Sequence, residues 1–316
     1  MKPGFSFNDA VGAPFVLLRR RPLSLCVWGL MMVAIVAASY SLMIPIFAAI
    51  PFGAADDQAA MAAYLQETTR FSASLNGMNA LMYLVMLVAW TAAGRAILSP
   101  GLGDRFLFLR LGMDEVRVAV AIVAVFAGWY VALLLLVLLG VGLGLAFWQT
   151  NEVATSAALI GYGVMVFLVS IWGLVRVSLI APATLILKRF AFAEGWAIAK
   201  GHVWKLIGLN LIVWVIYMLS AILMYALVGG VLAAGFFGQG LAWPEAVHSL
   251  ADLEHVFRPM MAPLALTAIP LALGMGWMMA LYAAPGVMAA RQLLDGVPAP
   301  APIVEDAPPV DTLQSS

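Results

Sequence analysis

The chain has 316 residues, of which 64% are hydrophobic and 10% charged, and its mean hydropathy is +1.02. Soluble domains carry about 25% charged residues, so this composition excludes an ordinary soluble protein. The formal net charge is +0, which leaves no basic footprint for nucleic acid, and the single cysteine, Cys26, excludes an internal disulfide.

Six apolar runs follow one another along the chain, and each exceeds the roughly 20 residues needed to cross the hydrocarbon of a bilayer. They cover residues 23–50, 75–98, 117–148, 157–187, 203–237 and 262–290. We therefore predict an all-α polytopic membrane protein with six transmembrane helices. An N-terminal segment with an interfacial stretch (1–22) would precede the transmembrane domain (23–294), and the Pro-rich acidic tail (295–316) is predicted to be disordered.

Basic residues gather in every second segment between these runs and are scarce in the others. Of the 16 Lys and Arg residues, only Arg70 and Arg258 fall in the segments that would lie outside if the N-terminus is inside. Such an imbalance orients spans during insertion, so both termini are predicted to be cytoplasmic. The first run follows Arg19 and Arg20 but is too long for the apolar part of a secretory signal, and we expect it to remain as a span.

A Phe-x-Phe pattern precedes every second span, at Phe5, Phe106 and Phe190. Residues 106–117 and 190–205 are predicted to form interfacial helices, with tryptophans at headgroup depth. The fourth and sixth spans also share a proline six places before a cation, Pro182 with Lys188 and Pro285 with Arg291. These features suggest a three-fold repeat of two-helix units, although chance similarity within an apolar alphabet explains them equally well.

Glycine and proline interrupt several spans. Small side chains permit close approach between helices, and the candidate contact positions are Gly140, Gly144, Gly161, Gly163, Gly274 and Gly276. Prolines remove a backbone donor, so kinks are predicted at Pro45, Pro182, Pro270 and Pro285.

Arg176 is the least expected residue because it lies within the fourth run, close to Ser178 and Pro182. A cation in a span is a functional hypothesis by default, and Asn210 of the next span is a further member of this candidate polar site. Arg176 is about 28 Å from the start of its span, so structural anchoring at the inner boundary is favoured over an ion or substrate site. An acidic or carbonyl partner is predicted for Arg176, with Asp114, Glu115 and Glu194 as the candidate carboxylates.

The segment before the sixth span carries Glu245, His248, Asp252 and His255. The last three could partly converge on one face of a helix, as zinc ligands do. Four such residues extend over about 15 Å of helix, however, which is too far for one ion. We therefore reject the metal site and predict an amphipathic helix that rests on the outer surface of the bilayer.

The motifs of the common enzyme classes are absent from the sequence: there is no nucleophile elbow, no Walker loop and no zinc-protease motif. No Asp, Glu or His lies deep within a predicted span. We therefore predict no cofactor and no enzymatic activity, but a membrane module that organises lipids or partner proteins. A transporter or channel for a small solute or lipid is the alternative, and an intramembrane enzyme is a third.

Residues 172–214 carry a family resemblance, through Arg176-Val177-Ser178-Leu179-Ile180-Ala181-Pro182 and Ala199-Lys200-Gly201. This stretch resembles the YciC-type inner-membrane proteins and the membrane domain of some glycerophosphoryl diester phosphodiesterases. Those proteins often have an acid soon after the proline, where this chain has Leu187 and Lys188. The resemblance implies a six-helix inner-membrane module and carries over no catalytic residue.

Overall fold

The structure is a computed structural model, and it describes residues 5–48, 58–99, 107–148, 152–238 and 261–295. The regular secondary structure of these residues is entirely helical. Six of the described helical spans are long and apolar enough to cross a membrane. The predicted all-α class and its six spans are therefore confirmed.

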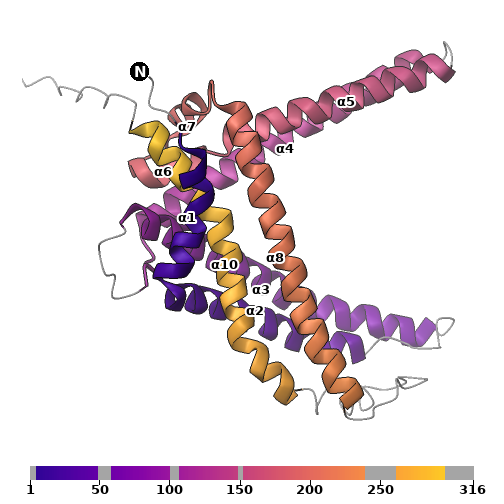
Figure 1. The fold of residues 1–316 in the computed structure, drawn as a ribbon. Coiled ribbons are helices and arrows are strands. Elements are labelled where there is room, and N and C mark those ends of the chain that lie inside the picture. Colours follow the sequence, from indigo (N-terminus) through magenta and orange to yellow (C-terminus); the bar gives the residue numbers. More distant parts are fainter. Residues whose placement is uncertain (1–4, 49–57, 100–106, 149–151, 239–260, 296–316) are drawn as a thin grey trace, which may run out of the picture.

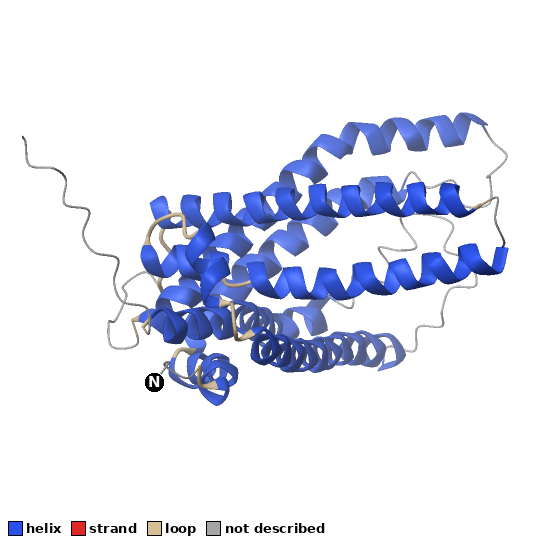
Figure 2. Cartoon of the chain, turned by 90° about the horizontal axis from the view of Figure 1, so that it is seen from above, coloured by secondary structure: helices blue, strands red, loops and turns tan. Residues whose placement is uncertain are grey.

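The long helices form three hairpins. These are α2 (Pro22–Ala48) with α3 (Gln58–Leu98), α4 (Met113–Phe147) with α5 (Glu152–Val177), and α8 (Val203–Gly238) with α10 (Met261–Leu294). The hairpins gather at one end, where the short helices α1 (Phe7–Arg20), α6 (Ile180–Leu187) and α7 (Phe192–Ile198) also lie, and they diverge toward the other end (Figure 1). We call the gathered end the α1 end; the long helices extend away from it in the view from above (Figure 2).

Glycines bring α2 and α10 into backbone contact. A Cβ added to Gly29 would overlap the carbonyl oxygen of Ala272, and one added to Gly276 would overlap that of Leu25. The prediction of close helix approach is thus confirmed for Gly276. It is wrong for Gly161 and Gly163, because a Cβ at either position would meet nothing within 4 Å.

The connections at the α1 end differ from the predicted interfacial helices. Residues 107–112 are not helical: Leu107 and Phe108 have left-handed φ angles of 54° and 64°, and α4 begins only at Met113. The predicted helix over 106–117 is therefore wrong for residues 107–112, whereas residues 113–117 are helical as the start of α4. The predicted helix over 190–205 is divided into α7 and the start of α8, with Gly201 at a φ of 88° between them.

The expected effect of Pro182 appears as a break rather than a kink. Helix α5 ends at Val177, and Pro182 lies in the first turn of α6, where a missing N–H leaves no hydrogen bond unmade. Pro270 and Pro285, by contrast, lie inside the continuous helix α10.

The buried core lies mainly toward the α1 end, where Trp28, Leu179, Leu206 and Val287 are almost fully enclosed. Large apolar side chains along α4, α5 and α8 are exposed instead, including Leu135, Phe167 and Ile222. Hydrocarbon rather than water is the solvent that suits such surfaces. The rejected metal cluster at His248, Asp252 and His255 and the acidic tail from 296 onward lie outside the described residues, and those two expectations stay predictions.

Candidate functional site

Arg176 lies near the end of α5 and is held against two indole rings. Its guanidinium carbon is 4.5 Å from the ring centroid of Trp196 and 5.4 Å from that of Trp172, and the two indoles meet edge to face. Only 8% of the residue is exposed. Among the described residues, its Nε is the one buried side-chain nitrogen or oxygen without a hydrogen-bond partner.

The chain around α6 and α7 positions Trp196 against α5. Lys188 adopts a left-handed conformation that ends α6, and a salt bridge of 2.8 Å between Arg189 and Glu194 spans the turn that follows. The backbone N–H of Ala191 donates to the hydroxyl of buried Thr184. Helix α7 can then approach α6 closely because Gly195 has no side chain; a Cβ there would lie 2.6 Å from Cα of Ile180.

The carboxylates expected to pair with Arg176 are engaged elsewhere. Asp114 pairs with Arg117 at 3.3 Å, Glu194 pairs with Arg189, and Glu115 pairs with Arg95. Within the described parts of the chain, no carboxylate or carbonyl oxygen pairs with Arg176. The prediction of an acidic or carbonyl partner is therefore wrong for these residues, and cation–π contacts stand in its place.

An apolar groove of about 390 Å³ runs beside this arginine, between α4 and α5 and along α7. Trp172 and Trp196 belong both to its lining and to the contacts of Arg176. The other large rings of the lining are Trp129 and Phe192, and Gly128 leaves the α4 wall open. The groove is thus an apolar channel whose lining includes both indoles that contact Arg176, although Arg176 itself is not among the lining residues.

The remaining predicted site residues do not join this cluster. Ser178 donates its hydroxyl to the carbonyl of Val175 at 2.8 Å and so caps its own helix. Asn210 is exposed on α8, and neither it nor Pro182 lines the groove. None of these three residues lines the groove, and the polar site that groups them with Arg176 stays a prediction.

The sequence analysis missed a second arginine, Arg95, whose side chain is 17% exposed and pairs with a buried carboxylate. Glu115 is only 3% exposed, and it pairs with Arg95 while accepting hydrogen bonds from the Thr91 hydroxyl and the Gly112 backbone. Arg95 also donates to the carbonyl of Phe108 at 2.8 Å. The one local signal is the placement of Glu115 three residues after Gly112 at the start of α4, as in a helix cap.

This ion pair fixes the turn between α3 and α4. The indole N–H of Trp28 donates to the carbonyl of Leu107 at 3.1 Å, and the guanidinium of Arg21 lies 4.6 Å above the ring of Phe108. Since every donor and acceptor here contacts a backbone or side-chain group of the protein, we assign this cluster a structural role.

A second groove, of about 350 Å³, lies between α1 and the ends of α3 and α10. It contains three arginines, Arg20, Arg21 and Arg291, together with Asp9. These arginines keep partial contact with solvent, unlike Arg176. Water can therefore solvate the charges of these three arginines, so they need a bound anion less than the buried Arg176 does.

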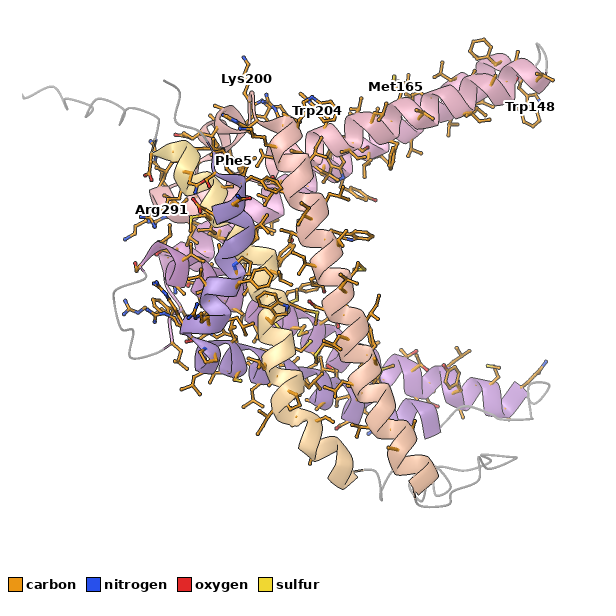
Figure 3. The ribbon with its side chains drawn as sticks, viewed as in Figure 1. Phe5, Trp148, Met165, Lys200, Trp204 and Arg291 are labelled. Atoms are coloured by element: carbon orange, nitrogen blue, oxygen red, sulfur yellow. The ribbon has the colours of Figure 1, made fainter. Side chains whose placement is uncertain are left out.

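The labelled side chains place charged and aromatic groups at the same end. Lys200, Trp204, Phe5 and Arg291 lie at the α1 end, whereas Met165 and Trp148 lie along the outer part of the α4–α5 hairpin (Figure 3). Indoles and lysines gathered at one depth are typical of a membrane interface.

The described residues contain no group of three or more His, Cys, Asp or Glu side chains arranged to hold a metal ion. Comparison with known proteins adds no assignment: no family model, no curated protein and no solved structure matches the chain.

Proposed function

We propose that this chain is a non-enzymatic module of the bacterial inner membrane that binds and organises phospholipids at its α1 end. The observation that carries the proposal is the apolar groove between α4 and α5, whose lining includes the two indoles that hold Arg176. A phospholipid has the matching form, with apolar chains attached to a charged headgroup.

The distribution of charge supports a cytoplasmic location for the α1 end. The Lys and Arg residues of the described part, apart from Arg70 on the first half of α3, lie at this end. They are on or next to α1, at the ends of α3 and α10, beside or at the start of α4, and between the end of α5 and the start of α8. By the positive-inside rule, such an end faces the cytoplasm. The groove would then open toward the inner leaflet.

The shape of the groove matters more than its hydrophobicity. Lipid chains in the bilayer are already in an apolar environment, so binding in the groove gains little from the hydrophobic effect. Selective retention has to come from close packing against rigid rings, here Trp129, Trp172 and Trp196, and from contacts of the headgroup.

The alternative functions have less support. A transporter needs a polar path or an unwound helix at mid-depth. The groove is lined by apolar and aromatic side chains, and the exposed Asn210 is not part of it. An enzyme needs titratable groups near Arg176, and its three candidate carboxylates are paired with other arginines. The resemblance to YciC-type membrane modules agrees with a role without catalysis.

Filling the groove tests the proposal. Gly128 lines the groove, and a Cβ added there meets nothing within 4 Å, so we expect Gly128→Leu to extend into the groove without a backbone clash. Gly161→Leu is the matched control, because Gly161 is equally unobstructed but lies outside the groove. Phospholipid retained per chain is measured by native mass spectrometry after extensive washing in detergent.

We expect Gly128→Leu to lose a tightly retained phospholipid that the unmodified chain and Gly161→Leu keep. Equal retention by all three proteins contradicts the proposal, as does a chain that holds no phospholipid after mild solubilisation.

A further inference from the structure

We infer that Arg176 is the headgroup seat of this groove and that it selects phospholipids with a net negative headgroup. This inference rests on the proposed function, because it assigns the lipid class to the same groove. Its occupant is one anionic phospholipid, with the phosphate at the guanidinium of Arg176 and an acyl chain along α4 and α5.

Arg176 is a buried cation without an anionic partner among the described residues, and a bound anion would compensate its charge. A cation that is 92% buried loses most of its hydration and needs compensation from a partner. The indoles of Trp172 and Trp196 supply part of this compensation through their faces. The indoles cannot accept hydrogen bonds that the guanidinium donates in its own plane. Nε is enclosed and has no acceptor among the described residues, so the donors that a ligand can reach are the two Nη atoms, which are not enclosed.

Phosphate oxygens can supply the hydrogen-bond acceptors that the guanidinium of Arg176 lacks. The guanidinium presents its donors as a planar fork, and a phosphate accepts two parallel hydrogen bonds from such a fork. The groove supplies the second half of the recognition, since an acyl chain attached to that phosphate extends into an apolar channel whose rings already touch Arg176. A free phosphate ion would bind the guanidinium but leave the apolar groove empty.

The surroundings favour a headgroup without its own cation. Lys188, Lys200 and Lys205 flank α7, and Glu194, the carboxylate of that helix, is paired with Arg189 at 2.8 Å. A zwitterionic headgroup would bring an ammonium toward this basic region. An anionic headgroup meets only attraction there, as juxtamembrane basic residues do with anionic lipids.

Competition between two lipids tests the inference. The full-length protein is exchanged into mixed micelles that hold equal amounts of phosphatidylglycerol and phosphatidylethanolamine with identical acyl chains, and the bound species are counted by native mass spectrometry. We expect the unmodified chain to favour the anionic lipid about fivefold, the ratio typical of one cation near a membrane surface. Arg176→Gln should bring the ratio close to one while lipid remains bound.

Two further variants control for charge and folding. Arg291→Gln removes a partly exposed cation at the same end and should keep the preference. Arg176→Lys retains the charge without the planar fork and should keep a reduced preference. Arg176→Lys also supplies a readout if Arg176→Gln fails to fold. A lipid ratio that falls in Arg176→Lys supports bidentate binding by the guanidinium. A lipid ratio that is unchanged fits a simple point charge and overturns the bidentate seat.

The outcomes separate the two proposals. If Gly128→Leu loses its lipid while Arg176→Gln keeps the fivefold preference, the headgroup inference is overturned and the proposed function stands. If Gly128→Leu keeps its lipid, the proposed function fails and the inference fails with it. Release of the bound lipid by millimolar inorganic phosphate, with phosphate taking its place, would assign the seat to a free anion and overturn the lipid as its occupant.

Discussion

Two arginines of this protein, Arg95 and Arg176, are held in opposite ways. Arg95, whose side chain is 17% exposed, has protein partners in Glu115 and the carbonyl of Phe108, whereas the buried Arg176 has indole faces and an unpaired Nε. A buried charge with all its partners fixes local structure, and one that lacks a partner leaves room for a ligand. This contrast is the reason that we assign a structural role to the first and a binding role to the second.

Removal of the Glu115 carboxylate should strongly destabilise the fold. Glu115→Ala leaves Arg95, whose side chain is only 17% exposed, without its counter-charge, and loss of one partner of a buried pair costs about 3 to 5 kcal/mol of the free energy of unfolding. Glu194→Ala is the control, because its partner Arg189 is 53% exposed and exposed pairs contribute only about 0 to 1 kcal/mol. Denaturant unfolding in detergent micelles measures both; a similar loss for the two variants would contradict the structural role.

Neither role follows from sequence alone. Arg95 and Glu115 fall in one predicted inner segment, and nothing in their spacing shows that the chain folds back to join them. Arg176 was identified because a cation within an apolar run is a local signal. Its expected partners were wrong because a partner depends on how α4, α6 and α7 pack, which no local pattern specifies.

At the scale of helices, the contact between α2 and α10 depends on two glycines that face each other's backbone. A methyl group at Gly29 or Gly276 would occupy the position of a carbonyl oxygen on the neighbouring helix. In an open helical position the same change from glycine to alanine is favourable by about 0.5 to 1 kcal/mol, because alanine has less backbone freedom to lose. The sign of the effect therefore reports the packing.

We expect Gly29→Ala and Gly276→Ala to lower the thermal unfolding midpoint of the purified protein, and Gly161→Ala to leave it unchanged or raise it. The control position has no atom within 4 Å of an added Cβ. An unfolding midpoint that rises in all three variants would show that α2 and α10 do not approach as closely as described.

The sequence predicted the elements whose signal is local. The six spans follow from apolar runs that, as helices, are long enough to cross the hydrocarbon core of a bilayer. Gly276 was correctly expected to support close helix approach. The helix predicted over residues 106–117 was wrong for residues 107–112 because the repeated Phe-x-Phe pattern says nothing about φ, and Leu107 and Phe108 both take left-handed values. The three-fold repeat stays a prediction: the three hairpins suit it, but the connections at 107–112 and 188–202 have different structures.

At the scale of the whole molecule, the long helices are joined at the α1 end and separate toward the other end (Figure 1). Helix α3 has 41 residues and is therefore about 60 Å long, twice the thickness of the hydrocarbon core. Its first turns, with Gln66 and the Glu67–Arg70 pair, have to lie beyond the bilayer on the side opposite the α1 end. Both lipid proposals require that the α1 end faces the cytoplasm.

The accessibility of the two ends to a thiol reagent in intact cells tests this orientation most directly. In a Cys26→Ala background, which removes the native thiol, single cysteines are introduced as Gln66→Cys on the first part of α3 and as Lys200→Cys at the α1 end; both positions are exposed. We predict that an impermeant maleimide labels Gln66→Cys in whole cells and labels Lys200→Cys only after the membrane has been opened. Labelling of Lys200→Cys in intact cells, with Gln66→Cys protected, would contradict the orientation and with it the placement of the lipid site in the inner leaflet.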